Sequence, residues 1–354
     1  MFEKELIERI QQLNSHVTQL RNLLKEEQVS KRDEKPRRSF DHTKYARRHV
    51  FLHVVISIDL RSNLCEGLGI FIPEGHQPKS SSSDLKDEIR YPYLLNKVLP
   101  PGIRAVAWAP VHDKLSSRFD CKHRTYHYYF PKADLNIDTM KVASQSLIGE
   151  HDFRNLCKMD VGNGVVQFTR RIIDIQIEAI DEDTTSSYAM YRLKLVGQAF
   201  LWVRCIVAVL FLVGQGKEEP TIVQELLDVG RNPRKPQYGM ASELPLNLFT
   251  CSYPEEDCKW IYDTESLRFV ISDYQKLWTE SNVKATMIGE MLNCLEQLPV
   301  ESKMENQIKG LLMGAERKTY IPLLKRPTCE SLEERIEHFA KRKRIEVVDD
   351  TETT

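Results

Sequence analysis

Two stretches with alternating apolar and polar residues decide the fold class: residues 173–179 read IDIQIEA, and residues 189–195 read AMYRLKL. Successive side chains of a β-strand point to opposite faces, so this alternation predicts two strands that each bury one face. The two stretches are close in sequence and are expected to pair as an antiparallel hairpin. Their buried face is expected to contain Ile173, Ile175, Ile177, Ala179, Ala189, Tyr191, Leu193 and Leu195.

The rest of the chain adds strands and helices in a mixed order. Runs of β-branched and aromatic residues predict further strands, and apolar residues at helical spacing predict helices. The strands are expected at residues 54–60, 103–109, 124–130 and 246–253, and the helices at 89–99, 138–147, 199–213 and 221–229. The composition beyond residue 260 is polar and helical. This mixed order predicts the α+β class with antiparallel sheets.

The composition excludes several classes of protein. Lys and Arg total 50 and Asp and Glu total 51 over 354 residues, so the chain is not a polycation. Apolar residues make up 41%, which is ordinary for a globular protein. The longest apolar run, residues 205–213, is far shorter than the roughly 20 residues that span a bilayer. This short run argues against a membrane segment, and the charged first residues lack an apolar signal core, so secretion is not expected.

The eight cysteines are scattered and include no CxxC pair, which argues against a zinc site and a disulfide framework. Reduced thiols in the cytoplasm or nucleus are therefore expected. The basic run 341–344 is interpreted either as a nuclear import signal or as a charged helix end. Gly-rich phosphate loops, HExxH and GxSxG are absent from the sequence, which argues against nucleotide hydrolysis, zinc proteolysis and hydrolase-elbow chemistry.

The N-terminal 30 residues are predicted to form a helix with an apolar seam. The seam residues are spaced by four, three, four, three and four, which is a heptad pattern, and they are Leu6, Ile10, Leu13, Val17, Leu20 and Leu24. Two interpretations fit: a coiled coil that forms a homodimer or binds a partner, or a helix packed on its own domain. The basic residues 31–48 either contact phosphate or serve only as a solvated linker.

The segment 117–130, SRFDCKHRTYHYYF, interleaves cations with aromatic residues. On a strand, Arg124, Tyr126 and Tyr128 share one face, while His127 and Tyr129 occupy the other. Such a pattern suits stacking on unpaired bases together with phosphate contacts. An aromatic strand packed in a core is the commoner alternative for this pattern.

The identity of these residues is more specific than their spacing. Arg118-Phe119 followed by RTYHY at 124–128 resembles a stretch of the TruA-like tRNA pseudouridine synthases. The resemblance continues through GEHDFRNLCKMD at 149–160, GQAFL at 197–201 and KPQY at 235–238. It covers about residues 47–343 and is closest to a eukaryotic branch that modifies uridines just 3′ of the anticodon.

The resemblance implies a pseudouridine synthase fold, with an antiparallel central sheet from two ferredoxin-like halves. It implies tRNA as the partner, a flipped target base and no metal or organic cofactor. An Asp carboxylate cleaves the glycosidic bond in this family. Tyr126 is expected to stack on the base and Arg204 to pair with that Asp, and the substrate-binding residues are expected to be Tyr126, Arg118, Arg124 and Lys158.

The resemblance also predicts a domain organisation. Residues 1–30 are expected as a helical N-terminus, 31–48 as a basic linker and 49–133 as a truncated N-terminal catalytic subdomain. Residues 134–262 are expected as the C-terminal catalytic subdomain, and 263–354 as a helical extension with a polar tail. The family implies a protein of the nucleus and cytoplasm.

The chain departs from the family where the catalytic Asp is expected. Residues 47–50 resemble the start of the family's first strand, whereas 55–62 already resemble the strand beyond the R-T-D-x-G catalytic loop. The intervening segment is absent from the sequence, and Asp59 and Asp160 are not favoured as replacements. Residues 200–204 are also two residues shorter than the family pattern, which changes the helical register before Arg204. Three functions stay open: a synthase that is inactive without this segment, a non-catalytic RNA-binding isoform, and a coiled-coil interaction protein.

Overall fold

The computed structural model describes residues 49–56, 67–71, 89–99, 103–111, 115–117, 119–158, 167–198, 202–254, 258–299, 306–312 and 319–338. The predicted N-terminal helix, the basic linker and the basic run 341–344 lie outside these residues, as do Arg118, Asp59 and Asp160. Two compact units divide the chain. The first comprises Met1–Cys121 with Cys251–Val300, and the second comprises Lys122–Thr250 with Glu301–Thr354.

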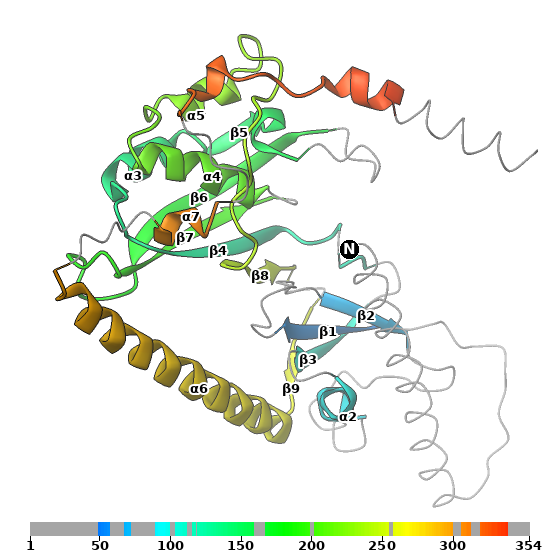
Figure 1. Cartoon of the computed structure of the whole chain (residues 1–354). Coiled ribbons are helices and arrows are strands. Elements are labelled where there is room, and N and C mark those ends of the chain that lie inside the picture. Colours follow the sequence, from blue (N-terminus) through cyan, green and yellow to red (C-terminus); the bar gives the residue numbers. More distant parts are fainter. Residues whose placement is uncertain are drawn as a thin grey trace, which may run out of the picture. The chain divides into compact units, whose positions relative to one another are not determined.

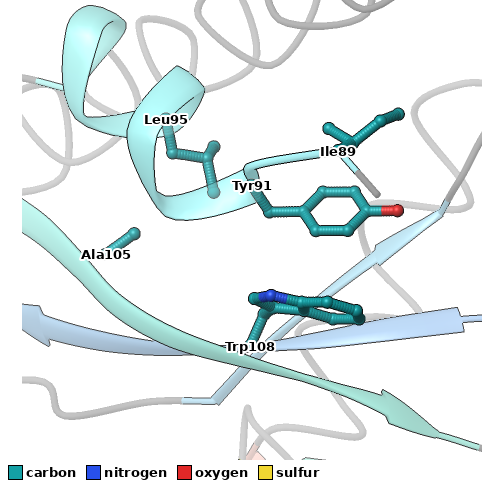
Figure 2. Close-up of a cluster of buried hydrophobic side chains, with 5 residues drawn as sticks. All are labelled: Ile89, Tyr91, Leu95, Ala105 and Trp108. Carbon is teal, nitrogen blue, oxygen red and sulfur yellow. The ribbon is translucent and has the colours of Figure 1, made fainter. Parts of the chain in front are cut away.

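The first unit contains a four-stranded sheet in the order β2-β1-β3-β9 (Figure 1). Its strands are β1 (His49–Ile56), β2 (Gly67–Phe71), β3 (Ile103–Val111) and β9 (Ile261–Tyr262), and neighbouring strands are antiparallel. Helix α2 (Tyr91–Val98) packs on β3 through a small apolar core (Figure 2). In this core the rings of Tyr91 and Trp108 lie 4.9 Å apart, and Leu95 and Ala105 are buried beside them.

Strand β1 begins five residues earlier than the sequence predicts and is continuous from His49 to Ile56. Its pairing with β3 changes register between His53, which lies opposite Ala107, and Val54, which lies opposite Ala105. This leaves Val106 of β3 as the extra residue of a β-bulge.

Helix α6 (Thr264–Glu296) is the longest helix of the described residues. Its N-terminus is capped by Asp263, whose carboxylate accepts hydrogen bonds from the backbone N–H groups of Glu265 and Ser266. The first turns are attached to the unit: Val270 is buried, and Asp273 accepts two hydrogen bonds from Arg104 of β3. From Gln275 to Glu296 every residue is exposed, apart from the half-buried Gly289.

The second unit contains a five-stranded sheet in the order β5-β6-β7-β4-β8. Its strands are β4 (His123–Pro131), β5 (Gly149–Asp152), β6 (Thr169–Ala179), β7 (Met190–Gly197) and β8 (Leu246–Ser252). Strands β6 and β7 pair as the predicted antiparallel hairpin.

One detail of that hairpin was predicted wrongly. The pairing of β6 shifts register between Ile172 and Asp174, so Ile172 is buried whereas Ile173 is 47% exposed. Ala179 is also exposed. The β-bulge moves one residue to the other face, and this cannot be read from strict alternation.

The helices of the second unit are α3 (Ile137–Gln145), α4 (Val203–Gly214), α5 (Ile222–Leu227) and α7 (Asn306–Lys309), with short 3₁₀ turns at Arg154–Leu156 and Leu323–Lys325. Helix α4 is buried around most of its circumference and forms the centre of the core. The α+β class with antiparallel sheets is confirmed. Within the described part of the chain, no helix combines the length and the apolar character needed to cross a bilayer.

Candidate functional site

Strand β4 distributes its aromatic side chains over both faces of the second unit's sheet. Tyr128 and Phe130 are fully buried, and their rings lie 6.0 and 5.3 Å from that of Phe211 in α4. On the other face His127 is buried against Phe249 of β8, with ring centroids 4.2 Å apart. Most of the aromatic pattern therefore forms core, as the commoner interpretation predicted.

Tyr126 lies on the same face of β4 as Tyr128, two residues closer to the start of the strand. It is 3% exposed and lies opposite Leu195 of β7. The ring of Tyr126 is therefore buried in the packed interior of the second unit. Arg124, two residues earlier on the same face, is half-buried.

Arg204 lies in the first turn of α4 and is held by the segment before β8. Its Nε donates a 2.7 Å hydrogen bond to the carbonyl of Ala241, and its guanidinium forms a 2.7 Å ion pair with Glu243. Tyr128 donates a 3.1 Å hydrogen bond from its hydroxyl to the carbonyl of Ser242. Residues 241–243 thus connect α4 to β4.

The electrostatics of this cluster keep the tyrosine neutral. Burial raises the pKa of Tyr128 above its usual range; the charge of Arg204 opposes this rise, and that of Glu243 adds to it. The Tyr128 hydroxyl is therefore a hydrogen-bond donor at neutral pH. Arg204, in the first turn of α4, and Glu243, before β8, thus have opposite effects on the pKa of Tyr128 in β4.

A second polar cluster connects the segment before Lys158 to α4. The ammonium of Lys235 is buried, donates a 2.8 Å hydrogen bond to the carbonyl of Cys157 and lies 4.3 Å from the ring centroid of Tyr238. Burial raises the pKa of Cys157 to about 12, although Lys235 opposes this rise. The thiol is therefore neutral and unreactive at physiological pH. Lys158 follows directly and is exposed.

The predicted site residues thus divide into two groups. Tyr126, Arg124, Arg204 and Lys158 all belong to the second unit, and Arg118 lies outside the described residues. The prediction that Tyr126 and Arg204 face one substrate stays a prediction. Sequence reasoning missed Glu243, because no spacing in the sequence connects it with Arg204. Among the described residues, no group of three His, Cys, Asp or Glu side chains could hold a metal ion.

Comparison with known proteins identifies relatives of the chain. A family model described as tRNA pseudouridine synthase matches residues 143–254. The human tRNA pseudouridine(38/39) synthase is 44% identical over 316 residues, which cover 82% of this chain and 65% of the human protein.

Two further relatives extend the comparison. A probable tRNA pseudouridine synthase of Caenorhabditis elegans is 35% identical, with 80% of this chain and 73% of the relative covered. The tRNA pseudouridine(38/39) synthase of Saccharomyces cerevisiae is 34% identical, and the match covers 82% of this chain and 64% of the yeast protein. The chain therefore spans about two thirds of the length of the human and yeast relatives.

Proposed function

We propose a function for this chain from the premise that it belongs to the tRNA pseudouridine synthase family. The chain recognises the anticodon arm of tRNA around uridines 38 and 39, the positions named for its human and yeast relatives. Because its sequence lacks the R-T-D-x-G segment, it binds this RNA without converting uridine to pseudouridine.

The proposal of tRNA as the substrate rests on the relatives and on the basic residues of the second unit. Lys158 is exposed after a segment that is fixed by the Lys235 cluster, so its ammonium projects from a rigid base. Arg124 lies on β4, two residues before Tyr126. Cations near an aromatic wall suit the binding of an RNA loop, in which bases are unstacked and phosphates are accessible.

The proposal that conversion is absent rests on one observation: the sequence lacks the R-T-D-x-G segment, and the guanidinium of Arg204 is ion-paired with Glu243 in its place. The family resemblance assigns a catalytic Asp as the partner of Arg204, and the R-T-D-x-G loop that carries this Asp is absent from the sequence. Without a carboxylate at the glycosidic bond, the remaining residues can hold a base but cannot cleave the bond. Loss of such a group lowers the rate by orders of magnitude.

The conversion assay uses an anticodon stem-loop RNA with uridine at positions 38 and 39. Pseudouridine is measured by mass spectrometry after a derivatisation specific for it. The unmodified chain is expected to produce none. A version with the family's R-T-D-x-G segment restored between Val50 and Val55 is expected to convert the RNA, and its Asp→Ala variant is not. Conversion by the unmodified chain that disappears in Glu243→Gln would instead assign the carboxylate role to Glu243.

The binding assay uses the same RNA at several salt concentrations. Each phosphate contact releases counterions, so affinity should fall steeply with salt. Lys158→Ala is expected to reduce the slope of log K against log salt by about 0.7 to 1. Lys141→Ala, at an exposed lysine of α3, is the matched control and should leave the slope unchanged. Salt-independent or absent binding would favour an interaction protein.

A further inference from the structure

A helical segment of the second unit places two glutamates against basic side chains of the same unit. Residues 332–338 are helical, and Glu334 forms a 3.0 Å ion pair with Arg234. Glu333 is the second carboxylate. Hydrogen bonds at the start of the helix, and next the charges of Arg154 and Arg234, lower the pKa of Glu333. The first turn of this helix therefore lies over two arginines.

The helix is attached to the unit by few contacts. Leu332 is half-buried and packs on the cluster of Cys157 and Phe168, whereas most other side chains of the helix are exposed. Ion pairs between exposed side chains contribute little to stability. The segment before the helix is held more firmly, because the backbone N–H of Cys329 donates a 2.7 Å hydrogen bond to the carbonyl of Lys235. The helix can therefore leave the arginines while the preceding segment stays attached.

The cap of the helix does not need the contact with Arg234. Ser331 and Glu334 form a capping box: the N–H of Ser331 donates to Oε2 of Glu334 over 2.8 Å, and the N–H of Glu334 donates to Oγ of Ser331 over 3.2 Å. A glutamine serves this cap as well as a glutamate. The other carboxylate oxygen, Oε1, accepts the hydrogen bond from Arg234. The ion pair is thus additional to the cap.

The carboxylates around the two arginines exceed the charge of the guanidinium groups. Arg154 donates hydrogen bonds of 2.9 and 2.6 Å from Nε and Nη2 to Asp152. With Glu333 and Glu334 beside them, two guanidinium groups face three carboxylates. Displacement of the helix removes two of these three and leaves the cluster with a net positive charge.

The arginines lie close to the lysine that is predicted to bind RNA. Lys235, the neighbour of Arg234, donates its 2.8 Å hydrogen bond to the carbonyl of Cys157, and the exposed Lys158 follows directly. The planar guanidinium group binds phosphate through two parallel hydrogen bonds, as it binds carboxylate. A phosphate of an RNA that is bound at Lys158 can therefore replace the carboxylate of Glu334 on Arg234.

We propose that Arg234, with Arg154 beside it, binds a phosphate of the RNA, and that residues 332–338 cover this site in the free protein. RNA then displaces the helix, and Glu333 and Glu334 form an autoinhibitory contact. The inference rests on the proposed binding of RNA, to which it adds a phosphate site and its regulation.

The affinity test uses the full chain and the anticodon stem-loop RNA of the binding assay. Glu333→Gln/Glu334→Gln removes two negative charges and keeps the acceptor of the capping box. Asp134→Asn/Glu182→Gln is the matched control at two exposed acidic residues. Glu182 follows the end of β6, and Asp134 lies beside the same loop, whereas Asp152 pairs with the start of β6.

The Glu333→Gln/Glu334→Gln variant is expected to bind the RNA about tenfold more tightly than the native chain, because phosphate no longer competes with two carboxylates. The control should stay within about twofold of the native chain. Adding Arg234→Gln to the first variant should abolish the gain, whereas adding Lys141→Gln, at an exposed lysine of α3, should retain it.

The second test measures amide hydrogen exchange of residues 332–338 by mass spectrometry, with and without the RNA. In the native chain the RNA is expected to speed this exchange about fivefold or more, because it displaces the helix. A general attraction between opposite charges would raise affinity without faster exchange. Unchanged or slower exchange with bound RNA would therefore overturn the inference.

The affinities separate this inference from the proposed function. Equal RNA affinity of the native chain and Glu333→Gln/Glu334→Gln would overturn the autoinhibitory contact and leave the proposed RNA binding intact. Binding only by Glu333→Gln/Glu334→Gln would support the contact, with the site fully covered in the native chain. Absence of binding by every variant would overturn the proposed RNA binding, and this inference with it.

Discussion

Arg204 and Ala241 are joined by two hydrogen bonds that run in opposite directions. The backbone N–H of Ala241 donates to the carbonyl of Arg204 over 3.0 Å, and Nε of Arg204 donates to the carbonyl of Ala241 over 2.7 Å. Ala241 is fully buried. The pair therefore fixes the start of α4 to the segment before β8, with Glu243 completing the charge balance.

Replacing Arg204 should cost more stability than replacing its acidic partner. Arg204→Leu removes the donor to a buried carbonyl, which is expected to lower the free energy of unfolding by about 1–3 kcal/mol. Glu243→Gln keeps an acceptor and loses only a partly exposed charge, at a cost below about 1 kcal/mol. Urea unfolding measures both, with Arg231→Leu in an exposed ion pair as the control. Equal costs for the two changes would show that the ion pair with Glu243 contributes more to stability than the hydrogen bond to the Ala241 carbonyl.

His127 should make the protein less stable in mild acid. Burial, and next Arg192 and Lys194, lower the pKa of His127 from 6.5 to about 4, while Glu178 opposes the shift. Below pH 6.5 the unfolded chain binds a proton that the native protein does not bind. Stability therefore falls as the pH drops from 6.5, and this contribution levels off below pH 4.

Between pH 7 and pH 5 this single group should lower the free energy of unfolding by about 2 kcal/mol. His127→Gln, which keeps a hydrogen-bond acceptor near Tyr129, should show a pH dependence that is shallower by that amount. Chemical denaturation at both pH values measures the difference. Identical pH dependence in the two proteins would mean that His127 titrates normally.

Two glycines should respond to alanine in opposite directions. A Cβ at Gly214 would lie 2.6 Å from the sulfur of Met140 and 3.0 Å from Leu135, where α4 approaches α3. Gly214→Ala should therefore destabilise the protein by about 1–3 kcal/mol. At Gly289 of α6 a Cβ meets nothing within 4 Å, so Gly289→Ala should raise stability by about 0.5–1 kcal/mol. Thermal unfolding of the two variants tests this difference, and a stabilising Gly214→Ala would contradict the close approach.

The ion pair between Arg104 and Asp273 should attach α6 to β3. The Arg104 side chain is 7% exposed, and its Nε and Nη2 lie 2.9 and 2.5 Å from one carboxylate oxygen of Asp273. Asp273→Ala leaves a buried charge without this partner and should cost about 3 kcal/mol. Arg104→Met in the same chain should restore part of the loss, which a double-mutant cycle measures. Additive costs would show that the two residues are not coupled.

Much of the fold was predictable because local patterns agree with tertiary packing. The β6–β7 hairpin, the strand at 123–131 and the helix at 137–145 follow from residues a few positions apart. The bulges at His53/Val54 and Ile172/Asp174 were not predictable, since they depend on how a neighbouring strand is aligned. The early start of β1 has the same cause.

The sequence by itself determined the family, the lack of an R-T-D-x-G motif and the heptad spacing of residues 6–24. These properties depend only on which residues follow one another in the chain, and no tertiary contact is needed to recognise them. Only the tertiary structure decided that Tyr128 and Phe130 belong to the core and that Arg204 is held by Ala241 and Glu243. Such contacts join residues far apart in the chain, and their strength depends on burial and direction, which the spacing of residues along the sequence does not encode.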